Sequence, residues 1–414
     1  MKVSPPLNNC LAVELLKLSP GSAQNFTDNS DLIEIAPVVL PEGDLLLGKN
    51  DHFGWPVATM AGKALIVVFH RKPQHWGDKD LPDANTSTAV VVRSTDGGRT
   101  WSAPLNLKDC VKRETSGCRL GFGNTIGLDS RGRPLVVTSF GVFRSEDEGA
   151  TWNHLEEAFG ENQLSGPVTN NGPVLLRHPV KGLVAPGHPS RSGRENSDGT
   201  PFIAPELWLR MSRDDGETWS EEKVDLPDFA TAIEPTLLWH EGLFLVVARC
   251  HGAGVGSFEP ERGTWRYVQL WSHAGWHPLE AKFTTMRATG QATGWHGPWT
   301  QDTVDLSWNP VSNRIEALTT NRGGGGPQNE QEHVQTLNLW SIGLDEVDSA
   351  DWKFETTLLS RDGTFEEHDD GMHPGGAVID TERGVQHIFI YAGRAEGPSG
   401  IFRITRSLDT GLLN

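Results

Sequence analysis

Three copies of one eight-residue pattern constrain the fold of this chain more than any other feature. The pattern S-x-D-x-G-x-T-W occurs at Ser94–Trp101, Ser145–Trp152 and Ser212–Trp219. Its Asp carboxylate can accept backbone N–H groups within a turn, its Gly can supply a positive φ, and its Trp can fill a seam between neighbouring units. Because a box that recurs along a chain marks repeated supersecondary units, the pattern predicts a ring or stack of small sheets.

The pattern resembles the Asp box of the sialidase-type β-propellers. In that family the box forms the hairpin between the two outer strands of a blade, and it lies on the face opposite the active site. The resemblance therefore implies a fold, and it implies almost nothing about activity.

A second repeat consists of two apolar runs separated by a tight turn such as Asp-Ser-Arg-Gly, which is typical of a β-hairpin. Six such hairpins begin near residues 52, 123, 172, 234, 303 and 373. We therefore expect an all-β fold, a single β-propeller of four-stranded antiparallel blades over residues 1–414. Six blades are counted, and a seventh within residues 10–48 stays open. A strand at 11–18 or 32–40 would pair with the C-terminal strands and close the ring.

Composition agrees with short strands joined by many turns. The chain has 414 residues, of which 36% are hydrophobic, with 15 Trp, 46 Gly and 26 Pro. Its formal net charge of −18 argues against nucleic acid and anionic membranes as partners. An acidic substrate would need positive groups concentrated in one cleft. We expect a monomer.

Cysteine usage and the N-terminal residues say less. Cys10, Cys110, Cys118 and Cys250 do not make a disulfide scaffold in a chain of this length. No run approaches the roughly 20 apolar residues of a membrane-spanning helix. The first 18 residues are a poor secretion signal, so we expect an intracellular protein or a secreted one whose leader has been removed.

The hairpin turns and the boxes share one face of such a propeller, so the opposite face, the mouth, carries the start of each first strand and the end of each second strand. Ligand sites of propellers form there. The mouth is rich in His, Arg and Asn, which predicts a binding site. Its residues are His52, His70, Arg71, Asn124, Ser139, Asn171, His188, Arg191, Glu234, Arg249, Cys250, His251, Asp302 or Asp305, Asn321, Arg322, His373, Tyr391 and Arg394.

These residue types favour one reaction over another. A sialidase-type hydrolase needs an arginine cluster, an acid and a tyrosine nucleophile activated by a glutamate, but this chain has only Tyr267 and Tyr391 and lacks an opening [FY]-R-I-P segment. A histidine-rich mouth suits β-elimination from a uronic acid, because histidine can donate or accept a proton near neutral pH. The sugar carboxylate must then be neutralised by Arg, Asn or protonated His.

Four segments, 49–58, 67–77, 369–380 and 387–409, resemble the propeller-type polysaccharide lyases, the ulvan lyases and the related rhamnose–glucuronate lyases. The resemblance favours seven blades and implies a catalytic histidine pair on the first blade, which His52 and His70 match. The aromatic and arginine partners of that family have no counterpart at the matching positions. Arg119, Arg144 or Arg191 would have to neutralise the carboxylate instead.

We therefore predict a polysaccharide lyase that cleaves a uronic-acid-containing glycan at a rhamnose–glucuronate type linkage, as in ulvan or rhamnose-capped arabinogalactan. His52 and His70 would be base and acid in an order left open, and the candidate sugar platforms are Trp55, Trp76, Trp295 and Trp299. The alternatives are a glycoside hydrolase of sialidase or rhamnosidase type and a non-catalytic carbohydrate-binding propeller. The predicted substrate-binding residues are Arg119, Asn124, Arg144, His188, Arg191, His251, Arg322, His373 and Tyr391.

The predicted partner is an acidic oligosaccharide or polysaccharide. No cofactor is required for either reaction. A structural divalent cation, Ca²⁺ or Zn²⁺, stays open, because Cys250 and His251 with His240 are the residue types that bind zinc, although their spacing is poor.

Overall fold

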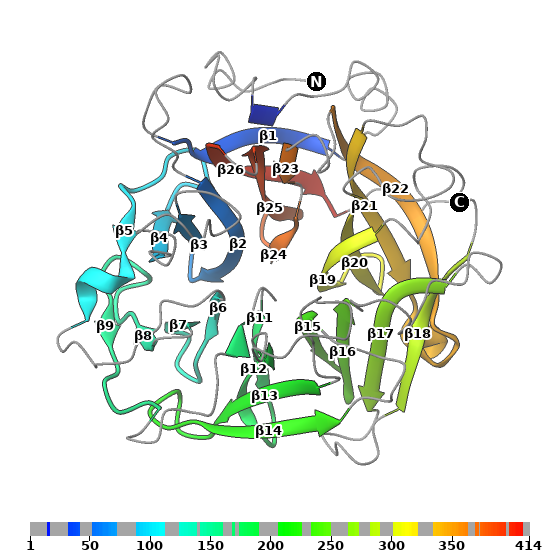
Figure 1. The fold of residues 1–414 in the computed structure, drawn as a ribbon, viewed down its shortest axis with the longest axis horizontal. Coiled ribbons are helices and arrows are strands. Elements are labelled where there is room, and N and C mark those ends of the chain that lie inside the picture. The colour runs from blue at the N-terminus through cyan, green and yellow to red at the C-terminus, as the bar shows by residue number, and fades with distance from the viewer. Residues whose placement is uncertain are drawn as a thin grey trace, which may run out of the picture.

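The protein is an all-β ring in which curled sheets surround a central axis (Figure 1). A computed structural model describes residues 15–16, 32–41, 52–72, 88–111, 124–138, 141–159, 168–169, 174–189, 206–225, 233–249, 264–272, 282–289, 301–321, 334–362, 369–371, 373–394 and 397–408. The strands form three sheets. Within this part of the chain, no helix is long and apolar enough to cross a membrane.

The first sheet joins the beginning of the chain to its end. Strand β1 pairs antiparallel with β26, and β2 pairs parallel with β26 at His52 and Ser399. A strand from the N-terminal part of the chain thus lies outside the last strands (Figure 1). The strands are β1 (Leu32–Val39), β2 (His52–Ala61), β3 (Ala64–Lys72), β4 (Thr88–Ser94), β5 (Leu105–Asn106), β23 (Asp369–Gly371), β24 (Gly375–Asp380), β25 (Val385–Arg394) and β26 (Ser399–Ser407).

The second sheet has the order β14-β13-β12-β11-β6-β7-β8-β9, with β10 paired to β12, and β11 and β6 are parallel. Its strands are β6 (Asn124–Leu128), β7 (Pro134–Thr138), β8 (Val142–Arg144), β9 (Asn153–His154), β10 (Val168–Thr169), β11 (Val174–His178), β12 (Gly182–Pro189), β13 (Glu206–Ser212) and β14 (Ser220–Asp225).

The third sheet has the order β15-β16-β17-β18-β22-β21-β20-β19, and β18 and β22 are parallel. Its strands are β15 (Ile233–His240), β16 (Leu243–Arg249), β17 (Thr264–Ser272), β18 (Lys282–Thr289), β19 (Gln301–Asn309), β20 (Arg314–Asn321), β21 (Val334–Ile342) and β22 (Asp351–Asp362). Two short 3₁₀ helices, η2 (Leu107–Cys110) and η6 (Leu344–Ser349), complete the described elements.

The predicted hairpins are the innermost pairs of these sheets. In the described residues, β2–β3, β6–β7, β11–β12, β15–β16, β19–β20 and β24–β25 are antiparallel pairs. Strands β2, β6, β11, β15, β19 and β24 lie nearest the centre of the ring in Figure 1. The all-β fold is confirmed. The blade number and the assignment of residues 1–414 to one domain stay predictions, and most of residues 10–48 lie outside the described residues.

The three boxes form the turns that the sequence predicts. In the second box, Gly149 N donates to Ser145 Oγ (2.8 Å) and Thr151 N donates to Asp147 Oδ1 (2.8 Å). The first and third boxes repeat these bonds. Gly149 has a φ of 89°, and a β-carbon built there would lie 2.6 Å from Ile66 of β3. The box is therefore both a turn and a contact with the neighbouring hairpin.

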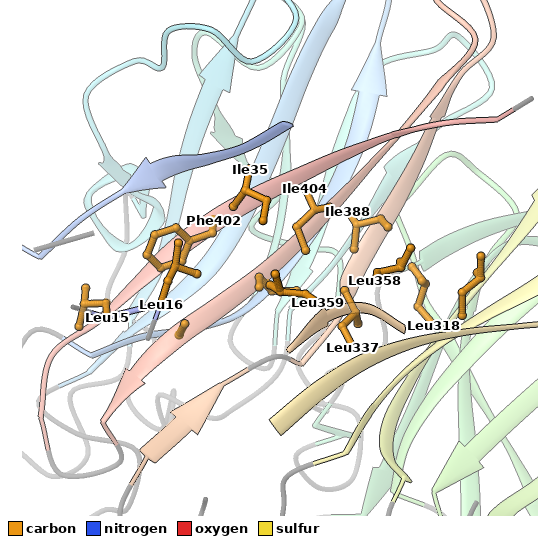
Figure 2. Close-up of a cluster of buried hydrophobic side chains, with 13 residues drawn as sticks. Leu15, Leu16, Ile35, Leu318, Leu337, Leu358, Leu359, Ile388, Phe402 and Ile404 are labelled. Atoms are coloured by element: carbon orange, nitrogen blue, oxygen red, sulfur yellow. The ribbon is translucent and has the colours of Figure 1, made fainter. Parts of the chain in front are cut away.

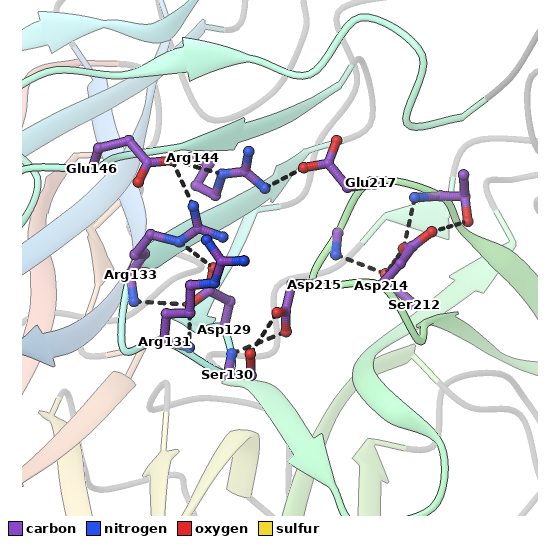
Figure 3. Close-up of polar contacts among 12 residues, drawn as sticks. Asp129, Ser130, Arg131, Arg133, Arg144, Glu146, Ser212, Asp214, Asp215 and Glu217 are labelled. Carbon is purple, nitrogen blue, oxygen red and sulfur yellow. Dashed lines mark hydrogen bonds and ion pairs between the residues drawn. The ribbon is translucent and has the colours of Figure 1, made fainter.

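The hairpin turns lie beside the boxes, at what we call the box end of the ring. Ser130, in the turn between β6 and β7, donates its backbone N–H to Asp215 of the third box (3.0 Å), as Figure 3 shows. A β-carbon on Gly62, in the turn between β2 and β3, would lie 2.7 Å from Glu148 of the second box. The starts of the first strands and the ends of the second strands therefore lie at the opposite end, the mouth.

Apolar seams hold neighbouring sheets together. In one buried cluster, Leu337 of β21 and Leu359 of β22 pack with Ile388 of β25 and Ile404 of β26 (Figure 2). The same seam also buries an ion pair between Arg406 and Glu316. Arg406 Nε donates to Gln386 Oε1 (2.6 Å), and Gln386 Nε2 donates to Ser307 Oγ (3.0 Å). Because each partner is hydrogen-bonded, the seam can hold these charges away from water.

Candidate functional site

The first hairpin carries both predicted catalytic histidines to the mouth. In the register of β2 and β3, His52 lies opposite Lys72 and Gly54 lies opposite His70. The turn of this hairpin, at Gly62, is at the box end, so these four residues are at the opposite end of the pair. The run ALIVVFHRK of β3 is almost entirely buried, which is typical of a strand covered on both faces.

A β-bulge in β2 places an indole between the polar groups. The register shifts between Gly54 and Val57, and Trp55 in the bulge has a φ of 49°, which is uncommon for a large side chain. The Trp55 and His70 ring centroids are 5.8 Å apart, edge to face. Lys72 Nζ lies 4.0 Å from the centroid of the Trp55 ring, within the range of a cation–π interaction. The bulge thus gives Trp55 contacts with both polar side chains.

The last hairpin completes the group. The ring of Tyr391, from β25, lies 5.7 Å from His52, 5.4 Å from Trp55 and 5.4 Å from His373, centroid to centroid. We call the six residues His52, Trp55, His70, Lys72, His373 and Tyr391 the mouth cluster. All six are buried, with at most 6% of their surface exposed. Two hairpins more than 300 residues apart in the sequence therefore build one packed group of imidazoles, indole, phenol and ammonium.

Burial changes the acid–base chemistry of the cluster. Burial and the nearby positive charge of Lys72 lower the pKa of His70 from 6.5 to about 3. His70 is therefore neutral at neutral pH, where it can accept a proton but does not start as an imidazolium. An anion bound beside Lys72 would offset the second of these two causes.

Asn124 is a second distinctive residue of the mouth. It begins β6, opposite Thr138 at the end of β7, and is only 1% exposed. Neither Nδ2 nor Oδ1 of its side chain has a hydrogen-bond partner. A buried polar group without a partner costs about 1–3 kcal/mol, so native proteins rarely keep one without a role. The amide can offer both a donor and an acceptor to a ligand.

The fourth hairpin repeats the bulge of the first and adds a carboxylate. The register of β15 and β16 shifts between Ile233 and Thr236, and Glu234 in this bulge has a φ of 51°. Arg249 Nη1, at the mouth end of β16, lies 3.0 Å from Glu234 Oε2. The mouth therefore also holds a largely buried ion pair, as expected from the placement of both residues there.

Arg144 is a correction. We predicted it to bind substrate, but it ends β8 directly before the second box, and so it lies at the box end. Its guanidinium contacts Glu217 Oε1 (2.6 Å) and Glu146 Oε1 (3.2 Å), as Figure 3 shows. The prediction is wrong because β8 runs away from the mouth, and the charge of Arg144 links the second hairpin unit to the third box.

Other predicted residues have a partial outcome or none. His188 lies in β12, where its backbone pairs with Thr169 of β10. Arg119, Arg191, His251 and Arg322 lie outside the described residues, as do Ser139, Asn171, Cys250, Trp76, Trp295 and Trp299. Among the described residues, no group of three or more His, Cys, Asp or Glu side chains could hold a metal ion. The proposed catalytic and binding roles stay predictions.

Sequence reasoning missed Lys72. It follows His70 by two residues, so alternation along β3 places the two side chains on one face of the strand. That spacing was a usable signal. The contact of Lys72 with Trp55 depends on the bulge in β2, which the sequence alone did not reveal.

Comparisons with known proteins bear on the fold. The BNR/Asp-box repeat family matches residues 92–103. A sialidase of Bacteroides fragilis (strain YCH46) is 27% identical over 159 residues, 36% of this chain and only 25% of that relative. The chain is similar to a Dyadobacter fermentans protein of unknown function, at 16% identity and a TM-score of 0.57, with 90% of this chain and 99% of that one covered.

Two sialidase structures are also similar. The NanB sialidase of Streptococcus pneumoniae is 10% identical, with a TM-score of 0.52, and the match covers 89% of this chain and 70% of that one. The Hadza microbial sialidase Hz136 is 14% identical, with a TM-score of 0.50, and the match covers 90% and 68%. At these identities the likeness is one of fold, and the fold is a sialidase-type β-propeller. The lyase resemblance is not among these findings.

Proposed function

We propose that the protein is a carbohydrate-active enzyme of glycoside hydrolase type that binds an acidic sugar at the mouth and cleaves its glycosidic bond. The observation that carries the proposal is the mouth cluster, in which proton-transferring side chains, an indole and an ammonium meet at the ligand-binding end of a sialidase-type propeller. The likeness to sialidases supports hydrolysis over the β-elimination that the sequence favoured.

Two residues support a sugar as the ligand. The apolar face of a sugar ring packs on aromatic side chains, and Trp55 supplies an indole within the cluster. Sugar hydroxyl groups donate and accept hydrogen bonds, which matches the unused donor and acceptor of the Asn124 amide. We therefore assign hydroxyl recognition to Asn124 and an apolar edge contact to Trp55, whose ring face lies under Lys72.

The distribution of charge supports an acidic sugar. The whole chain carries a formal net charge of −18, yet basic residues end the second strands at the mouth. Arg71 and Lys72 end β3 and Arg394 ends β25, while the charge of Arg249, which ends β16, is balanced by Glu234. A local positive field in a negative protein favours anionic ligands and rejects them elsewhere on the surface.

Hydrolysis requires one group that protonates the leaving oxygen and one that activates water or attacks the sugar. His70 is neutral before substrate binds, because burial and Lys72 lower its pKa to about 3, and an acidic sugar bound beside Lys72 would raise that pKa and make the imidazole a better proton acceptor. Proton delivery then falls to His52. Tyr391, which contacts His52, Trp55 and His373, holds these rings in one arrangement.

A second candidate, β-elimination from a uronic acid, is favoured by the Lys72–His70 pairing. An ammonium can neutralise the sugar carboxylate, and a neutral imidazole can take the adjacent proton. The two reactions leave different products, because only elimination forms an unsaturated uronate that absorbs ultraviolet light.

The test is incubation with sialosides, glucuronides, ulvan and rhamnose-capped arabinogalactan, followed by assays for released sugar and for ultraviolet absorbance. We expect released sugar without absorbance, and a KM at least about 10-fold higher in Asn124→Ala, which loses a buried hydrogen bond of more than about 1.4 kcal/mol. A gain of absorbance would replace hydrolysis with elimination. Binding without turnover would identify a carbohydrate-binding propeller, and no binding to any of these sugars would overturn the proposal.

A further inference from the structure

Asp305 is a carboxylate sealed between two innermost strands. It lies in β19 and is fully buried. Its Oδ2 accepts a hydrogen bond from Ala377 N of β24 (2.6 Å), and the backbone N–H groups of Gly376 and Leu306 also act on it. Its Oδ1 has no hydrogen-bond partner. A buried carboxyl group with an unused oxygen is costly, so its place in the seam calls for a structural role.

The carboxylate holds a bulge in β24. The register of β24 and β25 shifts between Gly375 and Val378, and Gly376 in the bulge has a φ of 68°. The bulge frees backbone N–H groups from the ladder with β25. Because Asp305 accepts from Ala377, it satisfies a donor that the bulged ladder leaves without a partner in β25.

This bulge interlocks with the bulge of β2. A β-carbon built on Gly375 would lie 1.6 Å from the carbonyl oxygen of Pro56, and one on Gly376 would lie 2.1 Å from Ala58 N. The two backbones therefore touch directly, with no side chain between them to absorb a shift. A displacement of the β24 bulge must be transmitted to the β2 bulge, where Trp55 lies.

The mouth cluster spans both bulges. His373 lies two residues before β24, Trp55 lies within the β2 bulge, and both rings contact Tyr391. We propose that Asp305 is a positioning residue of the mouth cluster, acting through the backbone of β24 on His373 and through the interlocked bulges on Trp55. Asp305 comes from a third hairpin, and none of the described contacts joins it to a ring of the cluster.

The acid–base chemistry of Asp305 fits this role. Burial raises its pKa from 3.8 to about 7, against the backbone N–H groups of Ala377, Leu306 and Gly376, which lower it. The folded state then holds a proton that the unfolded state has lost between pH 4 and 7. The stability contribution of this group therefore falls as the pH rises through that window. Asp305 stays in the seam although it lowers stability near neutral pH, which supports a role in positioning the mouth cluster.

A label on tyrosine tests the proposal without any assay of activity. The chain has only two tyrosines, Tyr267 and Tyr391, so 3-fluorotyrosine gives two ¹⁹F resonances, which Tyr267→Phe assigns. We expect Asp305→Ala to shift the Tyr391 resonance and leave that of Tyr267 in place. In Asp305→Asn the amide oxygen can still accept from Ala377, so the Tyr391 resonance should lie close to its native position. Ser307→Ala is the matched control, since Ser307 lies on the same face of β19 and accepts from Gln386 instead.

The kinetic arm rests on the proposed function. There we expect Asp305→Ala to lower kcat by about 10- to 100-fold with KM changed less than about threefold, because misplaced groups lose rate more than binding. An unmoved Tyr391 resonance, or the same shift in Ser307→Ala, would overturn the positioning role. A shifted resonance in a protein that turns over no glycoside would support it while the proposed function fails. If Asp305→Ala is not recovered folded, Asp305→Leu, which also removes the acceptor but keeps most of the side-chain volume, decides by the same two measurements.

Discussion

The two ends of the ring are built in different ways. At the box end, Asp147 and its counterparts Asp96 and Asp214 each accept hydrogen bonds from the backbone N–H and the hydroxyl of the threonine four residues later. Non-glycine residues adopt a left-handed backbone at both ends: Glu148 and Asp215 do so in box turns, whereas Trp55 and Glu234 do so inside strands at the mouth. A turn accommodates this conformation locally, but within a strand it shifts the register with the neighbouring strand.

The mouth departs from regular strand structure and ordinary side-chain pairing in ways that suit a ligand. Asn124 is buried without a hydrogen-bond partner, and burial depresses the pKa of His70. Natural proteins keep strained backbone and unsatisfied polar groups mainly at functional sites, where the surrounding fold holds them in place. The contrast therefore supports the mouth as the site of chemistry on grounds separate from any likeness to other proteins.

The largest expected effect is on catalysis at the mouth. His52→Ala should lower turnover of the glycoside by at least about 100-fold, because a positioned proton-transfer group contributes that much. The matched control is His154→Ala in β9, whose ring packs on Phe143 far from the cluster. Turnover is measured at saturating substrate. Equal losses of turnover in the two variants would contradict a catalytic role that is specific to the mouth.

The next effect is on stability at the box end. Gly149→Ala should destabilise the fold by about 2–4 kcal/mol, because it adds backbone strain and places a β-carbon 2.6 Å from Ile66. Gly132→Ala is the control, since Gly132 has a φ of 77° with no atom within 4 Å, so that only strain of about 1–2 kcal/mol applies. Urea unfolding measures both, and kcat of the folded protein should stay unchanged. A fall in kcat would connect the box to catalysis.

A pH comparison separates two buried histidines. Burial lowers the pKa of His70 to about 3, and burial with Arg403 lowers that of His387 to about 4. Each is neutral when folded while the unfolded chain takes up a proton below about pH 6.5, so each costs stability as the pH falls toward its folded pKa. His70→Gln and His387→Gln should both flatten the fall in Tm at low pH. Only His70→Gln should alter the pH–rate profile, and an equal change from His387→Gln would contradict this.

The smallest effect is expected from Arg144→Ala. Glu217 and Glu146, its partners, are both more than half exposed, so the ion pairs contribute less than about 1 kcal/mol. We expect KM for an acidic glycoside to stay within twofold of the native value. A several-fold rise in KM would show that Arg144 takes part in substrate binding, which would contradict its separation from the mouth.

The sequence predicted several features of the site because they are periodic. The S-x-D-x-G-x-T-W boxes mark turns, and the start of each apolar run marks the mouth, which placed His52, His70 and Asn124 correctly at one end. Arg144 was assigned to the substrate site, although it ends β8 directly before a box and so lies at the box end. Lys72 was missed because its place in the mouth cluster depends on its contact with Trp55.

By itself, the sequence determined the all-β class, the box turns and which residues share an end of the ring, since turn chemistry and alternation act within a few residues of each other. Only the tertiary structure decided that His373 and Tyr391 meet His52 and Trp55, because strands from the two ends of the chain must pair first. It also decided the interlocked bulges and the sealed carboxylate of Asp305. A bulge is a register shift between two strands, and burial depends on every neighbour, so neither is written in a local pattern.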